Sequence, residues 1–287
     1  MQAIIFALIS YFGWGIGDIF GTVATRKIGG YSTTFWYLVL QAIFVVPLSF
    51  LFFDQLRNIT LAIFILNVVL GVMGTAGLIA FYEGLRIGNS ALVGTIAGAF
   101  AALVVVFSVI FLNEKISLIQ LILIILIFTG ILMSTLDFKD LKNKAVWGNR
   151  GTVFALIAML LWGIYWTFIK IPIQTMGWFW PGMISILTFP IVLLFMRIKR
   201  IGLEHPNKKG ALRSLVMNAL LLGIGAWSFN FAIEQGLTSI VAPIAGSYPT
   251  LFVVLAFLFF KDPITRQQIL GIITTLVGIV LLSIFSV

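Results

Sequence analysis

The chain contains ten long apolar stretches, each about the length that a helix needs to cross a lipid bilayer. A spanning helix takes about 20 mostly apolar residues, whereas a barrel strand takes only about 9–11. Only helices and closed barrels span membranes, because lipid offers no partners to backbone polar groups. The sequence therefore predicts an all-α integral membrane protein with ten transmembrane helices, over residues 3–24, 33–53, 60–82, 90–112, 116–135, 151–171, 178–196, 212–234, 238–260 and 266–286.

Composition agrees with this fold class. Hydrophobic residues make up 61% of the chain and charged residues 9%, whereas soluble domains have about 45–50% and about 25%. The net charge of +9 comes from short loops between the spans, where basic residues indicate membrane topology rather than nucleic-acid binding. The chain has no cysteine, which excludes disulfides, thiolate metal sites and thiol catalysis.

The basic residues also predict how the chain lies in the membrane. An even number of spans places both termini on one side, and that side carries only Arg57, Lys115 and Lys170 of the 18 basic residues. Cytoplasmic loops carry the excess of Lys and Arg. We therefore expect a multi-pass plasma-membrane protein with both termini on the non-cytoplasmic side.

The second half of the chain repeats the first at a constant offset. Residues 96–98 read Ile-Ala-Gly and so do residues 244–246, while Trp-Gly-Ile occupies both 14–16 and 162–164, each pair 148 residues apart. We infer a duplication into residues 1–145 and 146–287, with five spans each. An odd number of spans turns the second half upside down, and inverted repeats of this kind are typical of secondary transporters.

Two acidic turns carry a resemblance to a known family. Residues 112–115 read Leu-Asn-Glu-Lys and residues 260–263 read Phe-Lys-Asp-Pro, again 148 residues apart, and each half has a Trp-Gly near its start. Over nearly its whole length the chain resembles the drug/metabolite transporter superfamily, EamA type. The resemblance implies ten helices, a central cavity lined by spans 1, 3, 4, 6, 8 and 9, and the movement of small organic solutes.

Matching interruptions in spans 4 and 9 predict where a solute binds. Gly98 and Gly246 are repeat-related, and span 9 adds Pro243 and Pro249, which remove backbone donors and kink a helix. Paired Gly and Pro interruptions in the two halves are the best sequence indication of a transporter site. Close packing of the helices through small residues is the alternative. Tyr248 offers a hydroxyl beside the break.

Aromatic and acidic residues on span 1 extend this site. Tyr11, Trp14 and Asp18 are spaced to share one helical face. On span 6, Trp162 and Trp166 hold the repeat-related positions of Trp14 and Asp18. Such aromatic faces suit a flat or cationic solute, although tryptophans also anchor helices at the lipid interface.

Span 8 and the end of span 3 complete the set of candidate residues. Trp227 and Asn230 share one face of span 8 with Glu234, whereas Glu83 is expected to pair with Arg86 three residues later. The predicted substrate-binding residues are Tyr11, Trp14, Asp18, Tyr82, Gly98, Trp162, Trp166, Trp227, Asn230, Gly246 and Tyr248.

Asp18 is also the predicted coupling residue. It lies about 24 Å along span 1 at 1.5 Å per residue, within the roughly 30 Å hydrocarbon core. Acidic residues at that depth are costly and mark functional sites. Asp18 can pair with a cationic solute or bind a proton that exchanges with solute, and a structural carboxylate satisfied by Thr22 is the alternative.

These features favour a secondary transporter that exports small amino-acid-like or amine-like metabolites by alternating access. A sugar-uptake permease of the same superfamily is the alternative, because aromatic faces also stack on sugars. A membrane-embedded enzyme is a remote third, since the chain has no cysteine and no His-Glu-x-x-His motif. We expect no cofactor, metal or nucleic acid; the partners are a small-molecule solute, the lipid bilayer and protons as coupling ion, and we favour a monomer.

Overall fold

The computed structural model describes residues 1–88, 90–135, 150–260 and 265–286. Within these ranges the fold is helical and contains no strand. Ten helical segments are long and apolar enough to cross a membrane, which confirms the predicted fold class and number of spans. The predicted boundary between the halves, at residue 145, lies outside the described residues.

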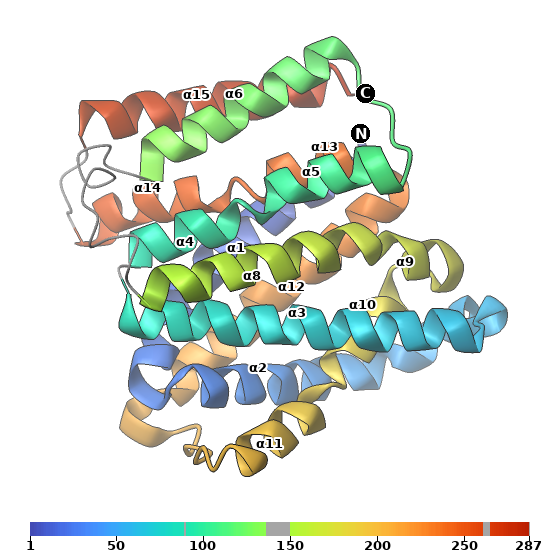
Figure 1. Ribbon diagram of the computed structural model, residues 1–287, viewed down its shortest axis with the longest axis vertical. Coiled ribbons are helices and arrows are strands. Elements are labelled where there is room, and N and C mark those ends of the chain that lie inside the picture. The colour runs from blue at the N-terminus through green and yellow to red at the C-terminus, as the bar shows by residue number, and fades with distance from the viewer. Residues whose placement is uncertain (89, 136–149, 261–264, 287) are drawn as a thin grey trace.

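The first five spans run from the N-terminus to Thr135. The second span continues as a 3-10 helix, η1, and the fourth is divided in two (Figure 1). Their elements are α1 (Gln2–Ile28), α2 (Gly30–Val45), η1 (Val46–Asn58), α3 (Leu61–Ile87), α4 (Ser90–Gly98), α5 (Phe100–Phe111) and α6 (Leu118–Thr135).

The remaining spans begin at Arg150. Spans six, seven and nine are each divided in two, and a short 3-10 turn, η3, precedes the eighth. Their elements are α8 (Arg150–Phe168), α9 (Lys170–Met176), α10 (Phe179–Ile186), α11 (Phe189–Ile198), η3 (Lys208–Gly210), α12 (Leu212–Gln235), α13 (Thr238–Ala245), α14 (Tyr248–Phe260) and α15 (Arg266–Ile284).

Helix α3 extends further than the sequence suggests. The predicted span ends at residue 82, but α3 continues to Ile87 because its terminal charges have partners. Arg86 Nη2 lies 2.7 Å from Glu83 Oε2, which confirms the predicted pair. The other carboxylate oxygen, Glu83 Oε1, accepts a hydrogen bond from the backbone nitrogen of Gly30 at 2.8 Å. This contact ties the end of α3 to the start of α2.

The predicted interruption of span 9 is present between α13 and α14. Helix α13 ends at Ala245, and α14 begins at Tyr248. Proline has no backbone N–H, so Pro249 cannot donate to the carbonyl of Ala245 as a continuous helix would require. Span 4 breaks at the matching place, since Ala99 separates α4 from α5.

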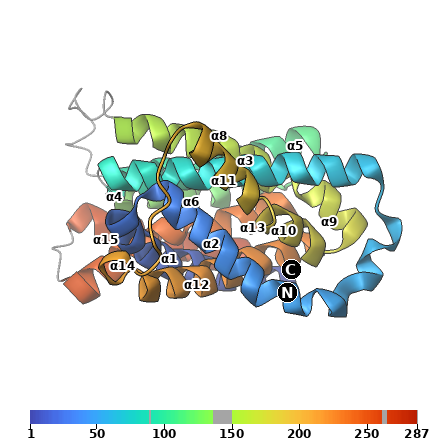
Figure 2. The ribbon, with the colours of Figure 1, turned by 90° about the horizontal axis from the view of Figure 1, so that it is seen from below.

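Long helices from the two halves pack side by side. Helix α1 packs along α12, α3 along α8, and α6 along α15. Figure 2 shows α3 and α8 on one side of the bundle and α1 and α12 on the other. Small residues permit the close approach: a Cβ on Gly13 would lie 2.8 Å from the Cα of Gly225. Small-residue contacts of this kind drive helix association in membranes, where lipid is as apolar as the helices.

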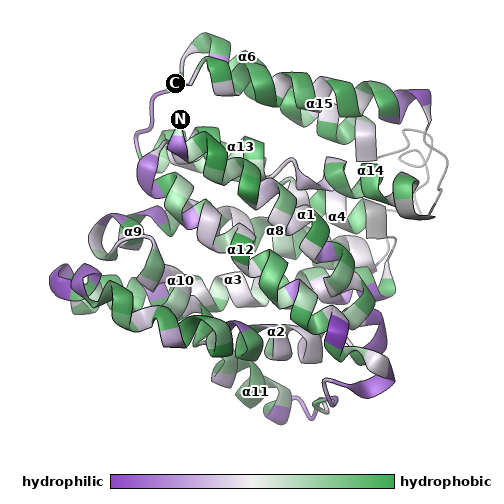
Figure 3. Cartoon of the chain, turned by 180° about the vertical axis from the view of Figure 1, so that it is seen from behind, coloured by the Kyte–Doolittle hydropathy of each residue, from purple (hydrophilic) through white to green (hydrophobic). Residues whose placement is uncertain are grey.

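The start of α1 and the end of α15 lie at one end of the bundle, which we call the terminus end (Figure 1). Helix α6 ends and α8 begins at the opposite end, which we call the linker end. Hydrophobic residues follow the helices along their length, whereas hydrophilic residues gather toward the two ends (Figure 3). Large apolar side chains such as Ile110 and Val280 are exposed on the sides, as a bilayer-embedded surface requires.

Candidate functional site

A central cavity lies among the helices, on the side of Asp18 that faces the terminus end. Its volume is about 120 Å³, which is several times the roughly 10–15 Å³ that one water needs. It can therefore hold several waters or one small organic solute. The walls come from spans 1, 3, 4, 6, 8 and 9, as the family resemblance implies, and also from α2 and α10.

Seven of the eleven predicted binding residues line this cavity, and they come from four different spans. They are Trp14, Asp18, Trp162, Trp166, Trp227, Asn230 and Tyr248.

Asp18 is the only acidic or basic residue among the described residues that line the cavity. Its side chain is buried, and within the described part of the chain its carboxylate forms no hydrogen bond or ion pair. The Thr22 hydroxyl, expected as a partner, instead donates to the backbone oxygen of Asp18 at 2.7 Å. The carboxylate is therefore left to whatever enters the cavity.

Aromatic rings form the walls beside Asp18. Trp14 stacks on Phe229 with ring centroids 5.2 Å apart and lies 5.2 Å from Trp166. Trp162 contacts Phe100 edge to face at 5.8 Å, and its indole nitrogen donates to the carbonyl of Gly74 at 3.2 Å. These contacts fix the indole rings, and fixed ring faces next to a carboxylate suit a cationic or flat solute.

Polar groups that sequence reasoning missed lie on α2, α3 and α10. Tyr37, Gln41, Thr75 and Ser185 all line the cavity. The Gln41 amide donates to the carbonyl of Ala219, which joins α2 to α12. Gln41 is an uncharged polar residue inside an apolar stretch, but the resemblance implies a cavity lined by other spans than 2 and 7.

Asn230 brings an unpaired acceptor to the part of the cavity near the terminus end. Its amide nitrogen donates to the carbonyl of Trp178 at 3.3 Å. Its Oδ1 is buried and has no partner among the described residues. Nearby, Trp227 stacks on Phe179 with centroids 5.1 Å apart. A solute with a donor group can satisfy this oxygen.

The two predicted glycines do not line the cavity. A Cβ on Gly98 would lie 2.8 Å from Pro249 Cγ, and one on Gly246 would overlap the Ala101 side chain. Gly98 and Gly246 therefore permit close contact between the two interrupted spans. Close packing, the alternative to a binding role, is the arrangement that the structure shows.

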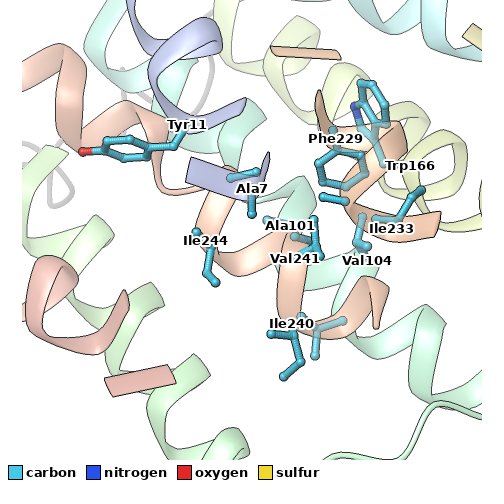
Figure 4. Packing of buried hydrophobic residues seen from close by; sticks show 14 of the residues in the cluster. Ala7, Tyr11, Ala101, Val104, Trp166, Phe229, Ile233, Ile240, Val241 and Ile244 are labelled. Atoms are coloured by element: carbon cyan, nitrogen blue, oxygen red, sulfur yellow. The ribbon is translucent and has the colours of Figure 1, made fainter. Parts of the chain in front are cut away.

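The two tyrosines Tyr11 and Tyr82 also lie away from the cavity wall. Tyr11 is buried beside Phe12 and points away from Trp166 and Phe229 (Figure 4). Tyr82 is fully buried, and its hydroxyl donates to Asn218 Oδ1 at 3.1 Å. Tyr11 was predicted from helical spacing, which does not determine how deeply a side chain is covered.

A buried carboxylate joins the two halves at the terminus end. Glu114 accepts hydrogen bonds from the backbone nitrogens of Thr238 at 2.8 Å and Ser239 at 2.7 Å, and from the Ser239 hydroxyl at 2.6 Å. Lys170 Nζ donates to the carbonyl of Gly236 at 2.6 Å and lies 3.5 Å from Glu114 Oε1. Glu114 therefore caps the start of α13, an element of the other half.

In the described part of the chain, ten helices long and apolar enough to cross a membrane surround a central cavity, and this arrangement defines a polytopic membrane protein. The sequence model of the EamA-like transporter family matches the chain twice, over residues 1–136 and 149–284. The chain belongs to the EamA-like transporter family, and it is a transporter.

Named relatives are consistent with this family. An uncharacterized protein of Methanocaldococcus jannaschii, MJ1333.1, is 29% identical over 139 residues, which cover 98% of that protein but 47% of this chain. The uncharacterized transporters YojE and YyaM of Bacillus subtilis are 24% and 36% identical. Those matches cover 46% and 37% of this chain and 47% and 36% of the two transporters.

A solved structure shows the same fold. It is titled only as the crystal structure of a protein, and it matches the whole of this chain and 99% of its own with a TM-score of 0.76 at 12% identity. This likeness supports the helical architecture alone.

Proposed function

We propose that the protein is a secondary transporter that exports small amine-like or amino-acid-like metabolites by alternating access. The observation that carries this proposal is the central cavity, where a single unpaired carboxylate, Asp18, lies among fixed aromatic rings. A protonated amine matches both features, because it pairs with a carboxylate and is attracted to ring faces. The free Oδ1 of Asn230 offers a second point of recognition for a donor on the solute.

The proposal includes two inverted five-helix repeats, residues 1–145 and 146–287. In the repeat, α1 corresponds to α8 and α3 corresponds to α12. The packed pair of α1 and α12 therefore has a counterpart in the packed pair of α8 and α3. Helices α6 and α15 correspond to each other and pack together, as a two-fold relationship requires. The match of one entire relative to about half of this chain also supports a unit of this length. Rocking of such repeats around a central site is the usual basis of alternating access.

Asp18 is the proposed coupling residue. A buried carboxylate without a permanent partner alternates readily between a bound proton and a bound cation, since each neutralises its charge. Export driven by proton entry follows if the two compete for Asp18.

The first experiment identifies the solute class. The purified protein is screened in detergent by thermal shift against amino acids, amines, sugars and nucleobases. A ligand at 100 times its Kd stabilises the folded protein by about 2.7 kcal/mol. We expect amines or amino acids to raise the Tm; a shift from sugars alone would instead support the uptake permease.

The second experiment tests the role of Asp18 in proteoliposomes with a radiolabelled form of the ligand found above. If Asp18 binds the coupling proton, Asp18→Asn abolishes gradient-driven transport but leaves solute exchange intact. If it pairs with the solute, both activities and binding are lost. Unchanged binding, exchange and pH dependence would remove Asp18 from the mechanism. Chemical conversion of the solute during transport would contradict the transporter itself.

A further inference from the structure

An apolar groove lies on the outside of the bundle, with walls from α8 and α11 and with α3 between them (Figure 1). Its volume is about 280 Å³, more than twice that of the central cavity. The walls carry large side chains: Ile157 on α8 is 42% exposed and Ile191 on α11 is 44% exposed. Helix α3 contributes smaller ones, such as Ala76 and Ala80. In a membrane-spanning chain, exposed apolar walls of this kind face lipid.

The floor of the groove separates it from the central cavity. Thr75 lines both spaces, and its hydroxyl lies 2.9 Å from that of Thr188, which donates to the carbonyl of Ser185 at 2.7 Å. The two threonine hydroxyls are therefore already hydrogen-bonded. Apart from Tyr31 at one end, the other described lining residues are apolar. Apolar spaces stay dry, so a hydrocarbon chain is the occupant that a bilayer offers.

The groove extends over one leaflet of the bilayer. On α3 it runs from Val72 to Ala80, a rise of eight residues, or about 12 Å at 1.5 Å per residue. Half of the roughly 30 Å hydrocarbon core is about 15 Å. At the linker end of the groove, Tyr31 stacks on Phe195 with ring centroids 6.0 Å apart, and tyrosine is enriched at the level of the lipid headgroups. One acyl chain of the linker-end leaflet therefore fits along the groove.

A basic residue stands at the linker end of each wall. On α8, Arg150 lies four residues before Phe154, and Lys199, just past the end of α11, lies four residues after Phe195. Residues four apart share a helical face, so each basic side chain continues the face that lines the groove. Both are exposed, and neither forms an ion pair among the described residues. The groove therefore ends at two unneutralised positive charges.

We propose that this groove binds one anionic phospholipid of the linker-end leaflet, with an acyl chain along α3 and the phosphate at Arg150 and Lys199. Basic pockets between membrane-spanning helices bind anionic headgroups. Arg86, at the end of α3, adds a third basic side chain, but Glu83 already neutralises it. The distribution of basic residues predicts that the linker end is cytoplasmic, and the cytoplasmic leaflet carries the anionic lipids. The site involves neither Asp18 nor the solute.

A second copy of the chain matches the same groove less well. Copies inserted in one orientation place their basic linker ends side by side, and like charges repel. A lipid phosphate instead complements Arg150 and Lys199. A zwitterionic lipid brings a positive group together with its phosphate and therefore gains less from these two residues.

The first part of the test concerns the headgroup. Binding of phosphatidylglycerol to the purified full chain in detergent is measured by native mass spectrometry, with phosphatidylcholine as the zwitterionic comparison. Arg150→Gln with Lys199→Gln removes the two charges at the groove. Arg197→Gln with Arg213→Gln is the matched control, because it removes two charges from the same end. Arg197 lies about 200° around α11 from Phe195, since each residue of a helix turns by about 100°.

The second part concerns the acyl chain. Ala76→Phe fills the groove from α3. Val69→Phe is its matched control, because Val69 lies on the same helix, is 51% exposed and does not line the groove. The Tm and elution of each variant show whether it folds. If Ala76→Phe fails to fold, Ile191→Trp narrows the same groove from α11.

We expect one bound copy of phosphatidylglycerol, with a Kd at least tenfold below that of phosphatidylcholine. Loss of Arg150 and Lys199 should raise this Kd at least tenfold, as should Ala76→Phe, whereas each control should change it less than twofold. An equal loss with the control pair of arginines would overturn the site, because the attraction would then belong to the whole basic end. Unchanged binding in Ala76→Phe would place the lipid outside the groove. A dimer of the chain that Ala76→Phe dissociates would assign the groove to a second copy.

Discussion

Glu114 should hold the terminus end of the transporter closed. Its carboxylate, in the first half of the chain, accepts hydrogen bonds from backbone nitrogens in the second half. The Glu114 side chain is only 5% exposed. Opening that end separates the turn after α5 from the start of α13. The three hydrogen bonds that Glu114 accepts there must then break.

The size of the effect follows from these contacts. Glu114→Gln keeps the shape of the side chain and one carbonyl oxygen, but it removes the charge and replaces the second oxygen with a donor. We count two lost hydrogen bonds to a charged group, at about 1.5 kcal/mol each. A loss of about 3 kcal/mol shifts the ratio of closed to open forms by roughly 100-fold.

The assay uses the absence of cysteine from the chain. A single cysteine, Ala226→Cys, is introduced on the wall of the central cavity and labelled with a membrane-impermeant thiol reagent in oriented vesicles. Glu114→Gln should raise the labelling rate from the terminus side by one to two orders of magnitude. Glu234→Gln is the matched control, because Glu234 lies at the same end and, among the described residues, its side chain bonds only to the neighbouring Gln235.

Two outcomes would refute the reasoning. Labelling within twofold of the unmutated protein, in a variant with unchanged Tm, would show that Glu114 does not hold this end closed. An equal rise with Glu234→Gln would show that loss of any acidic group at this end has the effect.

Three further predictions concern the hinge, the packing and the orientation. Pro249→Ala restores a donor to the carbonyl of Ala245 and should straighten span 9, slowing counterflow in liposomes; normal counterflow with normal stability would leave Pro249 only a packing role. Gly246→Leu should lower the Tm, because overpacking against Ala101 costs about 1–3 kcal/mol; an unchanged Tm would contradict the close contact. A reporter fused after Val287 should be active only outside the cytoplasm, and cytoplasmic activity would reverse the predicted orientation.

The helical fold was largely predictable because lipid restricts the options. Length and hydropathy determine a spanning helix almost alone, and all ten spans were found this way. Helix ends were predicted less well, since they depend on partners elsewhere in the fold. The end of α3 is an example, because the charges on Glu83 and Arg86 neutralise each other and one oxygen of Glu83 binds the start of α2.

The residues of the candidate site were predictable where their side-chain type is uncommon inside a membrane span. Asp18 and the tryptophans stand out because few charged or large amphipathic side chains occur inside apolar stretches. Gln41 and Ser185 were missed because isolated neutral polar residues are common in such stretches and often bond within the bundle. Their presence in the cavity wall depends on how α2 and α10 lean toward the centre, which periodicity does not reveal.

The interruptions in spans 4 and 9 were predicted at the right places, but the glycines at these breaks do not line the cavity. The break at Gly246 is present, but the glycine itself is used for contact with Ala101, just as Gly98 is used for contact with Pro249. Where two helices cross closely, the residues that permit the crossing are necessarily covered by it. The residues that reach the central cavity are Phe100 and Tyr248, at the first positions of α5 and α14 after the two breaks. A paired interruption therefore indicates the depth of the central cavity, and side chains that line it are found in the turn that follows.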